Sequence, residues 1–542
     1  MWEMSTLHMA IRTAKSTASL IPHPSSATDD PLNWKIKWKL LAISVQIAYC
    51  WVTVASALSV SPMNPLLAAE FDLSQTQLNL ITGSCVLALG YANFIIVPMS
   101  NIFGRRPTSI ALAAFAAGSC IWEARAQSYG SLIGARVVNG FATATSESMA
   151  VQVICDLFFL HERGFWMGVY FVTYFLGLFV GPIISGAIAS RHGWRSFFWL
   201  SLGLATLNLV SLILLFPETK YQRDEHDALF QAHAQSPVPP PASTASRKGA
   251  VTLAGDSEHV DAITSGGQAI EKSSDPESAL PAASSSPAGN GRPSKAQWKL
   301  FRRPDTKWKS MILKDIISAA SIFFFPIIFW AGITVAGFAN LLLLWNITQS
   351  EILAAPPYNF SVSAVGYTNF AFVVGGLIGL GTGGKFSDWL AKRSTKAANG
   401  IRQPEMRLPA LLPYLVLSIV AAVVGGMAEE NHWAWPILVV VGYGVSGLCI
   451  TAAPAIAIAY AIDSYKLVAG EIMVVATVLK NTCGFSMSYW VPQLTQSSGA
   501  LTPPMVQLAL TAGPVLLALP LWVWGHKLRR WTRNSRVHAM EG

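Results

Sequence analysis

Charged and polar residues interrupt one apolar segment of the chain, at residues 131–154. Arg136 and Glu147 are eleven positions apart, which is about three helical turns and roughly 16 Å of rise. Asn139, Gly140 and Thr143 fall on the same side of that helix. Because a charge that faces lipid at the centre of a bilayer is costly, such a stripe must face other helices or a water-filled cavity. We therefore expect Arg136, Asn139, Thr143 and Glu147 to border the cavity in which the protein performs its function.

Glu147 is the candidate proton-coupling residue. A carboxylic acid inside a membrane protein can exchange a proton when it is exposed in turn to either side, and substrate could compete with that proton. The alternative is a structural carboxylate that Arg136 or Lys480 keeps ionised. An ionisable residue within a membrane span is a functional candidate by default, which favours the first interpretation.

A second charged residue, Lys480, lies beside Asn481 in the middle of the apolar segment 469–491. Lys480 could contact an anionic substrate or pair with Glu147, whereas its midspan position disfavours snorkelling to an interface. Other side chains could line the same cavity or serve only as packing and interface anchors. These are Gln46, Tyr49, Tyr170, Tyr174, Trp330 and Asn340.

The composition indicates a membrane protein, since 52% of the 542 residues are hydrophobic and only 12% are charged. Twelve apolar runs are long enough for a bilayer core of about 30 Å. Because backbone polar groups in lipid must bond internally, we predict an all-α membrane protein with twelve helices in two six-helix bundles. The runs are 38–60, 78–99, 108–126, 131–154, 165–189, 195–216, 322–346, 362–384, 408–427, 435–460, 469–491 and 504–525.

Lys and Arg residues predict the orientation of the chain. Most of the 38 fall in alternate loops, in the arms and in the central linker, while the opposite loops hold only Arg125, Arg191 and Arg195. The positive-inside rule then places both termini in the cytoplasm. The net charge of +9 is thus a topological signal, and no nucleic-acid partner is expected. The predicted organisation is a disordered arm 1–37, a bundle 38–216, a disordered linker 217–310, a bundle 311–525 and a basic tail 526–542.

Several classes of site are not expected. The six cysteines have neither disulfide-framework nor metal-ligand spacing. No phosphate-binding loop of an ATP-driven pump and no metal cluster of a membrane enzyme occurs, so we expect neither cofactor nor enzymatic activity. Two glycosylation sequons, at Asn346 and Asn359, share one loop that the charge count assigns to the outside.

Two six-helix halves joined by a long inner loop resemble the major facilitator superfamily. The run Gly177-Leu178-Phe179-Val180-Gly181-Pro182-Ile183-Ile184-Ser185-Gly186 resembles the helix-five motif of its drug:proton antiporters, with Ser185 in place of a usual glycine. Small residues there allow another helix to approach closely, and Pro182 permits a bend. Arg136 followed by Gly140 resembles the helix-four pattern of the same family.

The loop motif of this family occurs twice. The first copy keeps Gly104, Arg105 and Arg106 but has Asn101 at the acidic position and Val97 at the leading glycine. The second copy has Gly384, Asp388 and Arg393. The resemblance implies that these loops lock the inner ends of the halves, with Asp388 facing Arg163 and with Arg105 or Arg106 facing Glu471. The alternative is that these charges face water and only set the topology.

Glu147, combined with the segments 460–465 and 470–471, resembles a fungal branch that includes polyamine and cation transporters and metabolite pumps. The resemblance implies a monomeric secondary transporter of the plasma membrane that exchanges protons for a small organic molecule and exports a drug or metabolite. Proton-driven uptake of a polyamine or another organic cation is the alternative within transport. A nutrient sensor that does not transport is the alternative from another class.

Overall fold

The computed structural model describes residues 29–221, 291–300, 308–397, 403–465 and 469–532. Within these residues the regular elements are helices, apart from one isolated β-bridge between Trp34 and Gly291. The prediction of an all-α protein is confirmed.

The first bundle begins at the start of α2 and ends at Leu215. Its long helices are α2 (Ile36–Ala57), α4 (Gln75–Phe103), α5 (Arg105–Arg125), α6 (Tyr129–Thr143), α7 (Thr145–Leu157), α8 (Leu160–His192) and α9 (Trp194–Leu215). Two short helices, η2 (Ser61–Met63) and α3 (Asn64–Phe71), link α2 to α4. The segment predicted as one helix over 131–154 is therefore two helices, α6 and α7, with a break at Ala144.

The second bundle is preceded by η3 (Lys295–Trp298) and by α11 (Trp308–Phe323). Its main helices are α12 (Pro326–Ala354), α13 (Val362–Thr368), α14 (Phe370–Ala397), α15 (Leu412–Glu430), α17 (Val445–Ser464), α18 (Ala469–Ser498), α19 (Thr502–Leu516) and α20 (Ala518–Thr532). The short elements η4 (Pro404–Leu411), α16 (Trp435–Ile437) and η5 (Leu438–Gly444) lead into α15 and α17.

Every predicted apolar run overlaps one of these helices or a consecutive set of them. Among the described residues, eight helices are long and apolar enough to cross a membrane, or nine if the bent pair α19 and α20 is one span. With 15 and 13 residues, α6 and α7 are each too short to cross alone. The helices α5 and α18, with 21 and 30 residues, are long enough to cross but are not among the eight.

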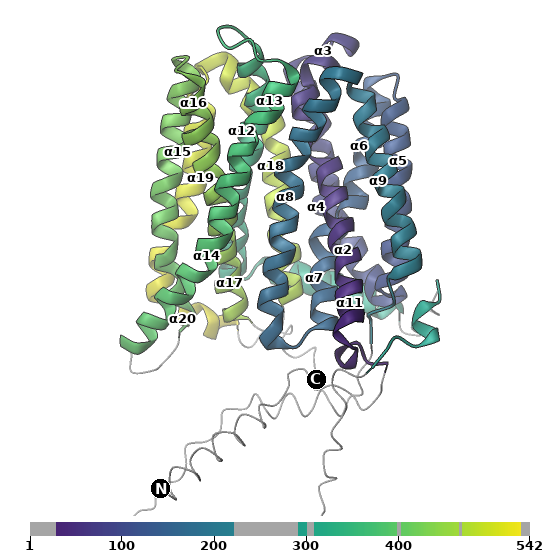
Figure 1. Cartoon of the computed structure of the whole chain (residues 1–542). Coiled ribbons are helices and arrows are strands. Elements are labelled where there is room, and N and C mark those ends of the chain that lie inside the picture. Colours follow the sequence, from purple (N-terminus) through teal and green to yellow (C-terminus); the bar gives the residue numbers. More distant parts are fainter. Residues whose placement is uncertain (1–28, 222–290, 301–307, 398–402, 466–468, 533–542) are drawn as a thin grey trace, which may run out of the picture.

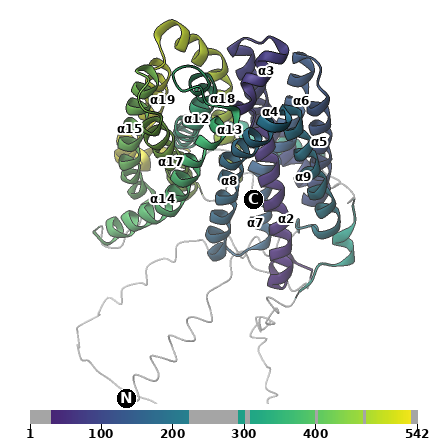
Figure 2. The same ribbon diagram turned by 45° about the horizontal axis from the view of Figure 1, so that its top comes forward.

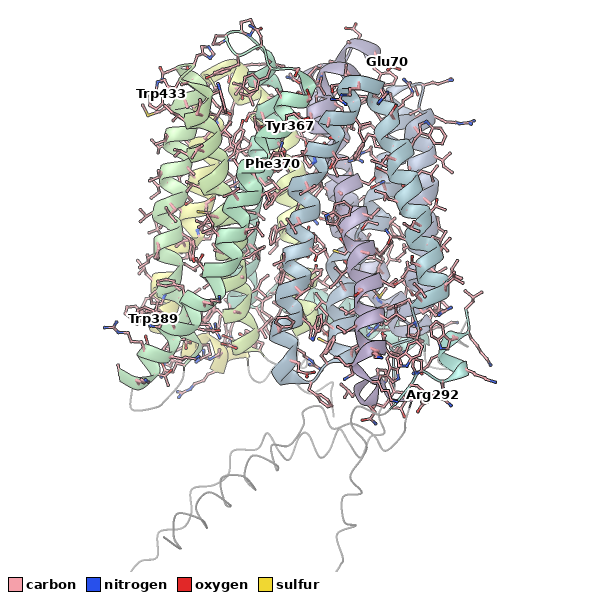
Figure 3. All side chains as sticks on the ribbon, in the orientation of Figure 1. Glu70, Arg292, Tyr367, Phe370, Trp389 and Trp433 are labelled. Carbon is pink, nitrogen blue, oxygen red and sulfur yellow. The ribbon has the colours of Figure 1, made fainter. Side chains whose placement is uncertain are left out.

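The two bundles stand side by side, with the first in purple and blue and the second in green and yellow (Figures 1 and 2). We call the end with α3 and α16 the upper end and the end with the start of α2 the lower end. Glu70 and Trp433 mark the upper end, and Trp389 and Arg292 mark the lower end (Figure 3).

The bundles are in close contact at the upper end. A Cβ atom on Gly186 of α8 would lie 2.8 Å from the carbonyl oxygen of Val362, at the start of α13. A Cβ atom on Gly366 would lie 2.9 Å from the carbonyl oxygen of Pro182. Ser61 donates to the carbonyl oxygen of Asn346, so that η2 and α12 are also joined. The upper end is therefore closed by backbone-to-backbone packing that only glycine permits.

The glycines of the helix-five motif serve two different contacts. Cβ atoms on Gly177 and Gly181 would each lie 2.9 Å from a carbonyl oxygen of α2, at Trp51 and Ala55. These two positions pack within the first bundle, whereas Gly186 packs against the second. One strip of small residues therefore fixes α8 to its own bundle and closes the upper end.

Gly186→Ala is expected to weaken the upper contact by roughly 1–3 kcal/mol, because the added methyl group must displace backbone atoms. A cysteine placed at Ser61, which is buried in that contact, should then react faster with a membrane-impermeant maleimide. Gly203→Ala is the matched control, since a Cβ atom there meets nothing within 4 Å. Equal reaction rates in the two variants would contradict this role of Gly186.

Candidate transport site

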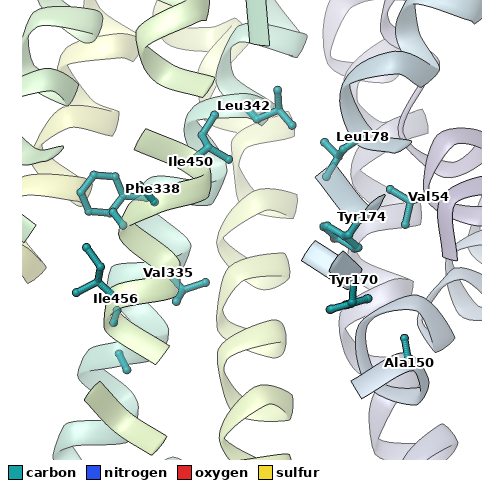
Figure 4. Packing of buried hydrophobic residues seen from close by; sticks show 14 of the residues in the cluster. Val54, Ala150, Tyr170, Tyr174, Leu178, Val335, Phe338, Leu342, Ile450 and Ile456 are labelled. Atoms are coloured by element: carbon teal, nitrogen blue, oxygen red, sulfur yellow. The ribbon is translucent and has the colours of Figure 1, made fainter. Parts of the chain in front are cut away.

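A cavity lies between the two bundles near the middle of the molecule. It has about 1060 Å³ of space free of atoms, including its mouth. Tyr170, Tyr174 and Leu178 of α8 lie on one side, and Val335, Leu342 and Ile450 of the second bundle lie on the other (Figure 4). Ligand sites in proteins are typically concave and mostly apolar with a few polar groups, which is the composition of this lining. Its polar lining residues are Thr82, Glu147, Asn340, Asn346, Thr477, Lys480 and Asn481.

An ion pair crosses the central cavity. Lys480 Nζ of α18 bonds to Glu147 Oε1 of α7, with 19% of the lysine side chain and 6% of the glutamate side chain exposed. The Tyr174 hydroxyl donates to the same carboxylate oxygen at 2.7 Å. The Tyr174 ring also lies 5.8 Å from Lys480 Nζ. The pair therefore joins the two bundles through a single carboxylate oxygen.

Neighbouring elements hold both partners in place. Glu147 lies in the first turn of α7, where the helix dipole favours an anion. On the other side, Asn340 of α12 donates to the carbonyl oxygen of Lys480 at 3.1 Å. Asn481 donates to Glu147 Oε2 at 3.5 Å, so both carboxylate oxygens face α18.

The expectation that Arg136 borders the cavity is wrong. Arg136 Nη1 lies 3.2 Å from Glu123 Oε1 of α5, and neither side chain is exposed to solvent. Arg136 also donates to the carbonyl oxygens of Ile81, Ser56 and Ala57, two of which end α2. The ion pair thus lies inside the first bundle, away from the central cavity.

Asn139 and Thr143 are also wrongly assigned to the central cavity. The Asn139 amide donates to Ser119 at 3.2 Å and to Glu123 at 3.4 Å. The Thr143 hydroxyl donates to the carbonyl oxygen of Asn139 at 2.8 Å. In α7, by contrast, Glu147 contacts Tyr174 of α8 and Lys480 of α18. The sequence analysis missed Glu123, although it is an acid inside the predicted span 108–126, the same signal that identified Glu147.

The aromatic and amide candidates divide into two groups. Tyr170, Tyr174 and Asn340 line the central cavity. Gln46, Tyr49 and Trp330 do not, and the structure corrects their expected place. Tyr49 accepts a hydrogen bond from Thr145, and Trp330 Nε1 donates to the carbonyl oxygen of Pro514 at 2.7 Å. Gln46 is fully buried within the first bundle. These three side chains pack within their own bundles.

The predicted contact between Asp388 and Arg163 is wrong. Asp388 of α14 accepts from Arg407 at 2.7 Å, and the same guanidinium binds Asp463 of α17 at 2.7 Å. Arg163 donates to the carbonyl oxygens of Cys155 and Phe158, at 2.8 and 3.0 Å. The Arg407 bridge therefore ties together three elements of the second bundle.

The first loop motif forms an equivalent bridge in the first bundle. Arg105 binds Asp156 of α7 at 3.1 Å and Asn101 of α4 at 2.8 Å. Glu218 accepts from the backbone N–H groups of Arg105 and Arg106, at 2.8 and 3.1 Å. Gly104, with φ 104°, makes the turn that positions both N–H groups.

Neither arginine of this motif has the expected partner. The Arg106 guanidinium donates to the carbonyl oxygens of Ile213 and Phe216, at the end of α9. Glu471 instead lines a second cavity. In the second motif, the Arg393 guanidinium carbon lies 5.6 Å from the centre of the Trp389 ring. A Cβ atom on Gly384 would meet none of the described residues within 4 Å. In this conformation, and among the described residues, the two motifs form one bridge within each bundle and make neither of the expected contacts between the halves.

The sequons have different surroundings. Asn346 is buried, lines the central cavity and accepts a hydrogen bond from Gln349 at 2.9 Å. In this conformation Asn346 is not accessible to a glycosyltransferase, so the structure corrects that expectation. Asn359 lies exposed in the loop after α12, and its glycosylation stays a prediction.

Comparisons with known proteins agree with this architecture. Residues 47–470 match the family model of the Major Facilitator Superfamily. An MFS-type transporter of Schizosaccharomyces pombe is 25% identical over 538 residues, which cover 95% of this chain and 89% of that protein. A probable efflux pump of Aspergillus flavus is 25% identical over 489 residues, covering 88% and 99%. The partially occluded inward open xylose transporter XylE from E. coli shares the fold, with a TM-score of 0.56, 12% identity and coverage of 90% and 99%.

Proposed function

Since the chain belongs to the Major Facilitator Superfamily, we propose that it is a secondary transporter that exchanges protons for a small organic molecule. The observation that carries this proposal is the Glu147–Lys480 ion pair, which joins the two bundles in the lining of the central cavity. Because one partner belongs to each bundle, a change in the charge of either side chain changes the attraction between the bundles.

The described conformation corresponds to one state of an alternating-access cycle. The upper end is closed by the contacts of Gly186, Gly366 and Ser61. A second cavity extends below Glu147 to Asn101 and Gly470, at the lower ends of α4 and α18. The site is thus connected to the lower side, which the charge distribution assigns to the cytoplasm.

Protonation of Glu147 provides the coupling. While Glu147 is ionised, it holds Lys480 across the central cavity and the pair is neutral. A proton on Glu147 removes this attraction, frees Lys480 and allows the bundles to move relative to each other. Substrate that binds between the two side chains has the same effect, and one carboxylate cannot serve both at once. Competition of this kind produces exchange.

The walls of the central cavity favour an organic substrate. Two consecutive turns of α8 present Tyr170, Phe171, Tyr174 and Phe175 to the cavity. Aromatic rings supply large apolar contact areas together with polar edges. Export is the favoured direction, because the similar A. flavus protein is named as an efflux pump.

Uptake of an organic cation is the second candidate, and one contact favours it. The Lys480 ammonium group already occupies Glu147 and lies beside the Tyr174 ring. A substrate ammonium group could take this place, with the same carboxylate and the same ring as partners. Uptake together with a proton then requires the proton to bind another group, because Glu147 cannot hold the proton and the cation at once.

Flux through the purified protein in proteoliposomes tests the proposal. With the proton gradient imposed in either direction, labelled spermidine and the dye rhodamine 6G are followed separately. Exchange predicts that substrate moves against the proton flow and that a protonophore abolishes the movement. Accumulation along the proton flow would support uptake. Binding without flux of either compound would contradict both candidates.

A further inference from the structure

The cavity below Glu147, here the lower chamber, has a wall that belongs to neither bundle. It is lined by α4, α7 and α18 and by Ile316 of α11. It shares Glu147, Met473 and Thr477 with the central cavity, so the two spaces meet at these residues. The helix α11 lies at the lower end of the molecule (Figure 1).

The helices α4 and α18 touch above the lower chamber and part around it. At the crossing, a Cβ atom on Gly90 would lie 2.8 Å from the Asn481 side chain. Higher up, Ser488 donates to the carbonyl oxygen of Asn79 at 3.2 Å. Below the crossing, Asn93 and Val97 of α4 and Val474 of α18 line the chamber instead. The gap between the two helices is covered by α11, which packs against both.

This gap lies beside the lipid-facing surface of the molecule. Tyr91 and Ile95 of α4 are 48% and 53% exposed, and they alternate with the chamber residues Asn93 and Val97. On α11, Ile317 is 42% exposed next to Ile316. Exposed aliphatic and aromatic side chains at membrane depth face acyl chains. Among the described residues, α11, whose chamber-lining Ile316 is itself 39% exposed, therefore covers this part of the chamber on the side of the lower leaflet.

The interior of the lower chamber indicates what it accepts. Apolar side chains of Phe94, Val97, Ile316 and Val474 line the side next to α11. Asn93, which is 1% exposed, has a buried Oδ1 atom without a hydrogen-bonding partner among the described residues. An unsatisfied buried acceptor is costly unless a donor reaches it. A molecule with an apolar body and an N–H or O–H group at one end satisfies both features.

We propose that the lower chamber opens sideways to the lower leaflet between α4 and α18, that α11 closes this portal, and that an amphiphilic substrate enters through it. This inference rests on the proposed transport function. The helix α11 can move as a unit, because its junction with α12 at Phe325 has no side-chain cap and Pro326 starts a new helix.

Labelling of the chamber from the lipid tests the portal without any need for transport. A cysteine at Val474, in a protein with Cys483→Ser, is treated in vesicles with a maleimide on a hexadecyl chain. Ile316→Ala should increase the labelling rate roughly tenfold, since it loosens the packing of α11 over the portal. Ile317→Ala is the matched control, because Ile317 is the neighbouring residue of the same type and is not among the residues that line the chamber. Equal rates in both variants would overturn the proposal.

Transport supplies the second test. With cysteines at Ile316 and Val474 joined by a bifunctional maleimide, rhodamine 6G flux should fall roughly tenfold, because closure of a gate limits turnover. Flux of water-borne spermidine should change little. Unchanged dye flux in the linked protein would overturn the portal. If the unlinked protein moves neither compound, the proposed function fails, while the labelling experiment still decides on the portal.

Discussion

Glu147→Gln is expected to abolish proton-driven exchange, with a loss of about 100-fold or more in rate. Glutamine preserves the shape of the side chain but cannot bind a proton or pair with Lys480. Truncating one partner of a buried ion pair costs roughly 3–5 kcal/mol, which amounts to more than a factor of 100 in an equilibrium. The measurement is substrate flux into proteoliposomes driven by a pH gradient.

The control for this variant is Glu430→Gln, which removes a carboxylate at the upper end where Glu430 accepts from the Leu501 N–H. Its exchange rate should stay within a factor of about two, as surface contacts contribute little. Lys480→Met should be as harmful as Glu147→Gln. The double variant should lose much less than the sum of both losses, because the two residues act as one unit. Exchange by Glu147→Gln that still follows the pH gradient would rule out this carboxylate as the coupling group.

The helical segments could be predicted from the sequence because length, apolarity and charge asymmetry are local properties. Pairing of Glu147 with Lys480 was one of two alternatives for the lysine, and it is the one present in the structure. The break at Ala144 could not be predicted, because neither glycine nor proline marks it. Ala144 keeps helical dihedral angles, with φ −59° and ψ −23°, and what differs between α6 and α7 is the set of helices that surrounds each of them. The stripe from Arg136 to Glu147 therefore divides between two environments.

The first loop motif shows a similar limit. Asn101 stands at the acidic position of the motif, and Asp156 and Glu218 supply the carboxylates that bind the Arg105 side chain and backbone. Glu218 lies 113 residues away from Arg105 in the chain. Comparison of a short motif cannot reveal a carboxylate that lies so far away in the sequence. Asp388 likewise pairs within its own bundle, so sequence similarity located the charged residues but not their partners.

Arg136→Met is expected to have the largest effect on stability. The Arg136–Glu123 pair is fully buried, and the guanidinium also binds the carbonyl oxygens that end α2. Its removal leaves Glu123 as an uncompensated buried charge, at a cost of roughly 3–5 kcal/mol. The melting temperature in detergent should fall clearly, and Glu123→Gln should lower it too. The affinity for substrate should not change in either variant, because the pair lies away from the central cavity.

The combined variant Arg136→Met and Glu123→Leu separates a structural role from a transport role. Replacing both members of a buried pair by apolar residues is often neutral or even stabilising, so most of the lost stability should return. Proton-driven flux per folded molecule should then remain within roughly threefold of the unchanged protein, in contrast to Glu147→Gln. A double variant that is stable but has lost proton coupling would show that this pair takes part in the cycle. In that case residues of α6 as well as Glu147 of α7 would take part in proton coupling.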